Sequence, residues 1–202
     1  MAPTNRFGDF EVSDPKAMRA LAHPVRLAIL EHLQRHGSAT ATQLSPHVGA
    51  TPSVTSWHLR HLARFGLVRD GDPGPDRRER QWAAAARGFT FEVSADPADE
   101  DARSAARMLS HQMFLRSADL PQRWLAAVEP ELDPEWRRLA GLSNTRVVVT
   151  AAELDAIEDA VELLLAPYVT RAPPHHPADA RGVRLLRYVL PEPADEPGPA
   201  TS

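Results

Sequence analysis

The most constraining feature of the sequence is a pair of short helical segments joined by a tight, glycine-containing connection. The first is expected from Thr40 to Gly49 and begins with a capping box, in which Thr40 and Gln43 satisfy free backbone N–H groups. The second begins at Thr51-Pro52, a cap residue followed by proline, and continues to about Phe65. Two short helices connected in this way are typical of a helix-turn-helix.

Segments on both sides extend this pattern. Upstream, Asp14-Pro15 and His23-Pro24 each place a proline in the first turn of a predicted helix. Downstream, the sequence predicts a β-hairpin from Leu67 to about Ala84, with a tip rich in Gly, Pro and Asp at 71–76. This hairpin would be the wing of a winged helix-turn-helix.

The helix that begins at residue 51 has two distinct faces. The residues expected to face the core share helical spacing: Thr55, Leu59, Leu62 and Gly66. The opposite face carries Ser53, Trp57, Arg60 and Arg64, with Ser56 beside them. Small hydroxyls let a helix N-terminus approach phosphates, and arginine can reach guanine edges, so this face favours insertion into the major groove of DNA. The alternative for Trp57 is packing under the wing or against the N-terminal arm.

The second strand of the hairpin alternates, so that Arg78, Arg80 and Trp82 share one face. Trp82 is expected to anchor the hairpin in the core, while the arginines can follow a minor groove or its phosphates. A solvent-exposed charged hairpin with Glu79 as a partner is the alternative. The predicted DNA-binding residues are Thr42, Thr51, Ser53, Ser56, Trp57, Arg60, Arg77, Arg78 and Arg80.

Charge is divided unevenly along the chain. Residues 1–91 hold 12 Lys+Arg and 8 Asp+Glu, a difference of +4, whereas residues 92–202 hold 11 and 19, a difference of −8. A basic first part is consistent with a polyanion as partner. Nearly all of its cations are arginine, which suits bidentate contacts to phosphate and guanine, although a genomic bias toward arginine would produce the same excess.

The second half of the chain carries weaker signals. Helical spacing over 102–120, the pair Asp133-Pro134 and a capping box at 150–153 predict three helical regions. The segments 145–150 and 182–190 predict strands on either side of the last helix. Such a small β-α-β unit needs cover from a helix or a second subunit, because two strands alone are marginal. The expected fold class is α+β, mainly α.

This reading divides the chain into three parts. Residues 1–91 are expected to form the winged helix-turn-helix, residues 92–190 a dimerisation region that could also bind an effector, and residues 191–202 a disordered, Pro-rich tail.

Several classes of protein are not indicated. No apolar run is long enough for a transmembrane helix and the N-terminus lacks the apolar core of a signal peptide, so a cytoplasmic protein is expected. Cysteine is absent, which excludes disulfides and thiolate metal sites. His32 and His36 have metal-competent spacing, but the neighbouring sequence offers no third ligand. No catalytic motif is recognisable, so we expect no enzyme activity, no cofactor and no metal.

The segments "DPKAMRALAHPVRLAILEHL" (14–33) and "SVTSWHLRHLARFGLV" (53–68), followed by the Arg-rich hairpin, resemble the ArsR-type winged helix-turn-helix transcriptional regulators. The resemblance covers roughly residues 13–90. It implies a homodimer that binds operator DNA, commonly as a repressor, and releases the DNA when an effector binds. It also maps the DNA-reading positions onto Ser53, Ser56, Trp57 and Arg60.

The chain departs from the metal-sensing members of that family. Those members use Cys pairs on the third helix or His/Asp sites on the C-terminal helices, whereas "ATQLSPHV" (41–48) contains no Cys. The resemblance therefore does not imply metal sensing, and the larger C-terminal part is similar to that of family members whose effectors are not metals. The expected function is a homodimeric, sequence-specific regulator that binds double-stranded operator DNA. The alternative is a winged-helix module that binds another protein without specific DNA binding.

Overall fold

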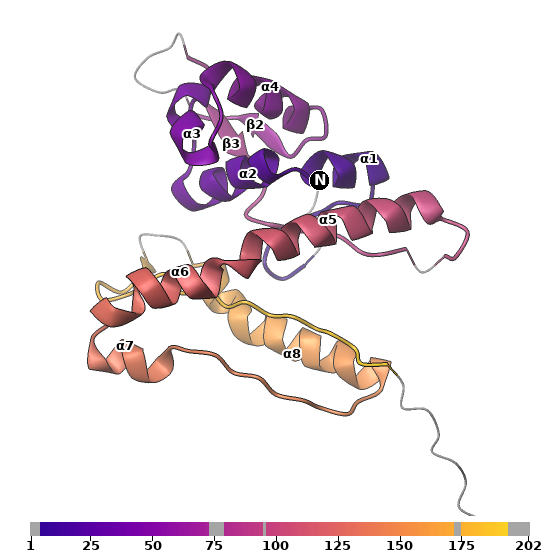
Figure 1. Ribbon diagram of the computed structural model, residues 1–202, viewed down its shortest axis with the longest axis vertical. Helices are drawn as coiled ribbons and strands as arrows, with labels where there is room; N and C mark the ends of the chain where they lie inside the picture. Colours follow the sequence, from indigo (N-terminus) through magenta and orange to yellow (C-terminus); the bar gives the residue numbers. More distant parts are fainter. Residues whose placement is uncertain (1–4, 73–78, 95, 172–174, 194–202) are drawn as a thin grey trace, which may run out of the picture. The chain divides into compact units, whose positions relative to one another are not determined.

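The computed structural model describes residues 5–72, 79–94, 96–171 and 175–193 (Figure 1). The chain forms two compact units, residues 1–170 and residues 171–202. Within the described ranges, no helix is long and apolar enough to cross a membrane. The boundary between these units does not coincide with the predicted functional boundary after residue 91. The division into a DNA-binding part and a dimerisation part remains a prediction.

Four helices form the N-terminal part of the first unit: α1 (Pro15–Leu21), α2 (Pro24–His36), α3 (Ala41–Val48) and α4 (Pro52–Ala63). Their starts follow the predicted caps. The Asp14 side chain accepts a hydrogen bond from the Lys16 N–H at 2.9 Å. The Thr40 and Gln43 side chains form the reciprocal capping box at the start of α3. The connection between α3 and α4 turns at Gly49, which has a left-handed φ of 68° that glycine adopts without steric cost.

The core lies between these helices and follows the predicted faces. The inward face of α4 is fully buried, with Thr55, Leu59 and Leu62 each 0 % exposed. Gly66, predicted to continue this face, is exposed, because α4 ends at Ala63 and the chain turns there with a positive φ of 69°. Burying a leucine side chain contributes about 1.5–3 kcal/mol, so this stripe fixes α4 against α2 and α3 and determines which face of α4 remains outside.

A short hairpin follows α4. Strand β2 (Val68–Asp70) pairs antiparallel with β3 (Trp82–Ala84), with Asp70 opposite Trp82. Trp82 is 3 % exposed and exchanges two backbone hydrogen bonds with Ala39, at 2.9 and 3.0 Å. The predicted wing and its buried anchor are therefore confirmed, although β3 begins later than residue 77. The predicted tip at 71–76 lies largely outside the described residues.

A second strand pair was not predicted. Strand β1 (Phe10–Glu11) runs parallel to β4 (Phe89–Thr90), and Arg87 bonds to the carboxylate of Asp9 at 2.9 Å. A Cβ on Gly88 would lie 2.3 Å from Asp9 Oδ1, so any larger residue there would displace the Asp9 carboxylate. The N-terminal arm is thereby fastened beside the base of the wing.

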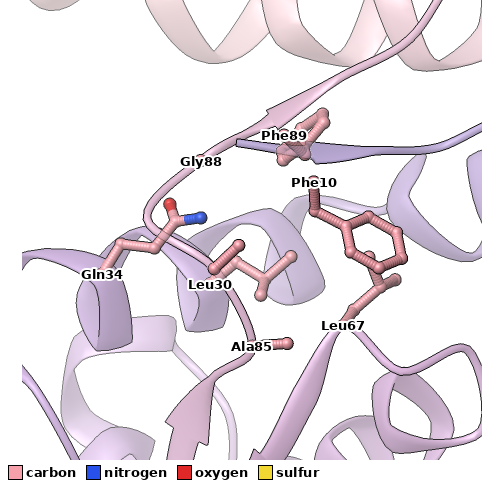
Figure 2. Close-up of a pocket in the computed structure, with 8 residues that line it drawn as sticks. Phe10, Leu30, Gln34, Leu67, Ala85, Gly88 and Phe89 are labelled. Atoms are coloured by element: carbon pink, nitrogen blue, oxygen red, sulfur yellow. The ribbon is translucent and has the colours of Figure 1, made fainter. Parts of the chain in front are cut away.

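Beneath this strand pair, the side chains of Phe10, Leu30 and Leu67 converge in a narrow crevice (Figure 2). The enclosed space is about 10 Å³, which is room for one water molecule. The crevice is therefore a packing gap between the arm, α2 and the wing, and it is too small for an effector.

Helix α5 (Glu100–Ala118) lies alongside α1 (Figure 1). Its small-residue face is buried: Ala102, Ala105, Ala106 and Leu109. Arg19 of α1 pairs with Asp101, and Arg116 near the end of α5 pairs with Glu31 of α2. Because alanines allow close approach, α5 packs firmly on the helix-turn-helix part while its other face remains exposed.

The remaining helices are α6 (Leu120–Ala127), the 3-10 helix η1 (Glu129–Glu131), α7 (Pro134–Leu139) and α8 (Ala151–Val169). The capping box at the start of α8 is present as predicted, between Thr150 and Glu153. The helical expectations for this half are thus confirmed.

The predicted strands at 145–150 and 182–190 are not found. In the described part of the chain, both segments run without regular secondary structure, so the β-α-β unit is reduced to its helix. The physical reason is that β-branched composition permits a strand, but a strand forms only where a partner supplies ladder hydrogen bonds. The fold class itself, α+β and mainly α with a winged helix-turn-helix, is confirmed.

Candidate nucleic-acid interface

The outer face of α4 is uncovered in the described structure. Ser53, Trp57 and Arg60 are exposed and Ser56 is half-buried, which is the orientation that the helical spacing predicts. Thr51, also among the predicted contacts, is exposed and caps α4 by accepting a hydrogen bond from the Val54 N–H at 3.4 Å. Because the opposite face is buried, α4 presents a polar, cationic and aromatic surface to solvent.

Arg60 is held in place by its own helix. Its Nη1 donates to Ser56 Oγ at 2.6 Å, one turn earlier. This contact restricts the long side chain and points the guanidinium along the exposed face. A pre-positioned arginine loses less conformational entropy when it binds a phosphate or a guanine.

Trp57 is 54 % exposed, so in the described part of the chain it is not buried under the wing or the arm. Its ring stacks on His61, with centroids 5.5 Å apart, and meets the edge of His58 at 4.9 Å. The aromatic ring is therefore fixed by histidines of α4 and leaves one side open to a ligand.

Of the three arginines predicted in the wing, the structure describes Arg80 alone. Arg77 and Arg78 lie outside the described residues. Arg80 donates from Nε to Asp70 Oδ1 at 2.6 Å, and its guanidinium carbon lies 4.0 Å from the centroid of the Trp82 ring. The hydrogen bond from Arg80 lowers the pKa of Asp70. Arg80 shares a face with Trp82 as predicted, but Asp70 already neutralises it.

Thr42 contacts the wing. Its Oγ1 donates to Glu79 Oε1 at 2.9 Å, which links the first turn of α3 to the segment that leads into β3. The sequence alone considered Glu79 as a partner for arginines and not for Thr42. The contact places a carboxylate next to a predicted DNA-binding hydroxyl.

The histidine pair on α2 gains a neighbour from α3. The rings of His32 and His36 lie 4.6 Å apart between centroids, and so do those of His32 and His47. Burial lowers the pKa of His32, and its two histidine neighbours lower it further. Across the residues that the structure covers, no group of three or more His, Asp or Glu is arranged to hold a metal ion.

The comparisons with known proteins concern the same region. A family model described as a helix-turn-helix domain matches residues 21–70, from the end of α1 to the end of β2. It covers about a quarter of the chain and confirms the helix-turn-helix. No curated protein sequence matches the chain.

Three solved structures are similar at low levels. The YusO protein from Bacillus subtilis has 16 % identity and a TM-score of 0.32, over 75 % of this chain and 81 % of that one. A mutant of ZitR from Lactococcus lactis, in its apo form, has 14 % identity and a TM-score of 0.32, over 73 % of this chain and 83 % of that one. A MarR family regulator from Neisseria meningitidis has 17 % identity and a TM-score of 0.30, over 71 % of this chain and 79 % of that one. Scores this low carry no argument about function.

Proposed function

We propose that the protein is a sequence-specific, DNA-binding transcriptional regulator of the ArsR type. The observation that carries the proposal is the outer face of α4, where Ser53, Trp57 and Arg60 are exposed while the opposite face is buried. A helix of this kind fits the major groove of B-DNA, and the adjacent wing can follow the phosphate backbone.

We further propose that the regulator is a homodimer with α5 in its interface. Helix α5 packs on α1 through its alanines and leaves large apolar side chains exposed: Met108 at 48 %, Phe114 at 48 % and Leu115 at 56 %. A two-fold axis near such a face would place two α4 helices about one DNA turn, or roughly 34 Å, apart on a palindromic site.

The proposal also covers whether the protein represses or activates its target and what kind of effector it binds. By its resemblance to ArsR-type regulators, the protein would act as a repressor that leaves its operator when an effector binds. The absence of cysteine from the sequence favours an effector other than a thiophilic metal.

One observation favours a second candidate function. Val54 is 45 % exposed beside Trp57, so α4 also presents an apolar patch that a protein partner could cover. A winged-helix interaction module would use this patch without reading DNA.

The test is fluorescence anisotropy with duplex DNA from the upstream region of the protein's own gene, measured against a scrambled duplex across a salt series. The proposal predicts tighter binding to the upstream duplex, a steep salt dependence and two subunits per duplex. Identical, weak binding to both duplexes would instead favour the interaction module.

A further inference from the structure

Four nitrogen-bearing side chains gather where the start of α2 meets α4, and none was predicted as a DNA contact. We define the basic cluster as His23, the N-cap of α2, and Arg26 of α2, together with His58 and His61 of α4. The rings of His23 and His58 lie 4.7 Å apart between centroids. Burial lowers the pKa of all three histidines, and the charge of Arg26 lowers it further. The histidines are therefore neutral near pH 7, and Arg26 carries the positive charge.

Two atoms of the basic cluster are buried without a hydrogen-bond partner. In the described part of the protein, neither Arg26 Nε nor His58 Nδ1 has one, and His58 is only 5 % exposed. The salt bridges found among those residues do not include Arg26. The Arg26 side chain as a whole is half-buried, but a buried polar atom without a partner is disfavoured, so these two atoms point to a ligand that completes the site.

His23 supplies a further donor. Its Nδ1 accepts a hydrogen bond from the Val25 N–H at 3.2 Å, so the proton of the neutral ring is on Nε2, which can donate to a ligand. The helical hydrogen bonds of α2 begin with the Leu27 N–H, so the backbone N–H of Arg26 belongs to the unpaired, positive end of this 13-residue helix. All these groups favour a compact oxyanion.

The basic cluster is continuous with the exposed face of α4. Trp57, which belongs to that face, contacts both His58 and His61. A ligand on the cluster would therefore lie beside the groove-facing surface, where the DNA backbone passes when a helix enters the major groove.

We propose that the basic cluster is a phosphate-binding site that takes one phosphate group of the DNA backbone next to α4. The proposal rests on the proposed function, because it assigns a backbone contact to a DNA-binding protein. Arg26 supplies the charge, and His23, His58 and His61 surround the phosphate oxygens. Such a contact positions the protein on the duplex and carries no sequence information.

The test compares Arg26→Gln with Arg35→Gln, a matched control that removes the same charge from an exposed position near the end of α2. Arg26→Gln is expected to weaken binding about tenfold, equally for upstream and scrambled duplexes, and to reduce the salt slope by about one. Arg35→Gln is expected to leave both quantities unchanged. Arg26→Lys, which keeps the charge, should recover most of the slope.

A scan of single methylphosphonate linkages, each of which removes one phosphate charge, identifies the phosphate. One linkage should weaken the wild type as much as Arg26→Gln does and should not weaken Arg26→Gln further. If Arg26→Gln does not fold, Arg26→Lys takes its place in the scan, and the effect of that linkage should then differ between this variant and the wild type. Equal binding by folded Arg26→Gln and wild type, or the lack of any linkage whose effect depends on Arg26, would overturn the site.

A measurement with inorganic phosphate distinguishes a phosphate group of the DNA backbone from a free phosphate ion as the ligand of the cluster. If it raises the melting temperature of the wild type but not of Arg26→Gln, and the DNA affinities of the two proteins are equal, the cluster binds a free anion and the DNA assignment is wrong. Failure of the wild type to bind any duplex would overturn the proposed function itself, which is a separate outcome.

Discussion

Thr42 Oγ1 donates a hydrogen bond to Glu79 Oε1 at 2.9 Å and so joins the start of α3 to the wing. Like the pair of Asp70 with Arg80, this contact holds a carboxylate against a predicted DNA-binding residue. Bound DNA would bring phosphates toward the same hydroxyl, so the contact and the phosphate compete for Thr42.

Glu79→Gln should therefore strengthen DNA binding severalfold and to a similar degree for any sequence, because removal of one negative charge near the backbone acts mainly through unspecific electrostatics. The gain should shrink as salt rises. Glu92→Gln, at an exposed position beyond β4, removes the same charge away from α3 and should change affinity little. An unchanged or lower affinity of Glu79→Gln would contradict this prediction.

Ser56→Ala should loosen Arg60, whose Nη1 is bonded to Ser56 Oγ at 2.6 Å. A typical hydrogen bond contributes about 0.5–1.5 kcal/mol, so the preference for the upstream duplex should fall by roughly two- to tenfold. A double-mutant cycle with Arg60→Ala measures this coupling directly. Strictly additive effects would mean that the two side chains act independently.

Thr55→Val should stabilise the protein. Thr55 is 0 % exposed, and within the described structure its Oγ1 has no hydrogen-bond partner. Replacing an unsatisfied buried hydroxyl with a methyl group of similar size is expected to add about 1 kcal/mol to the free energy of unfolding. Urea denaturation would show a higher midpoint at an unchanged slope. Thr55→Ser keeps the hydroxyl and should be less stable than the wild type.

Stability should depend on pH through His58. Burial lowers its pKa from 6.5 to about 4, with further contributions from His23, Arg26 and His61. Because the folded protein holds this ring neutral, the stabilisation is present above pH 6.5 and is lost as the pH falls toward 4. The loss is at most about 3 kcal/mol. Chemical denaturation at pH 7 and pH 4.5 in phosphate-free buffer should show a smaller difference for His58→Gln than for the wild type.

The sequence predicts the local parts of this fold well. Helix starts depend on neighbouring residues, and the caps at Asp14, Thr40, Thr51 and Thr150 all form as expected. Helical spacing also identifies the buried face of α4 correctly, because burial follows from the period of the helix.

Contacts between distant segments could not be predicted in the same way. The pairing of β1 with β4 and the bond from Arg87 to Asp9 join residues almost eighty positions apart. The approach of His47 to His32 and the basic cluster on α2 and α4 also depend on how helices cross. The prediction of strands at 145–150 and 182–190 was wrong for a related reason, because strand composition does not specify a partner strand.

The central claim is that the exposed face of α4 reads DNA, and Arg60→Glu tests it most directly. Arg60 is exposed, so the variant should keep the circular dichroism spectrum and melting temperature of the wild type. Anisotropy titration should show loss of the preference for the upstream duplex, with affinity reduced about 100-fold or more. Arg35→Glu, with the same charge change outside this face, should bind normally. Retained affinity and preference in a folded Arg60→Glu protein would contradict the account.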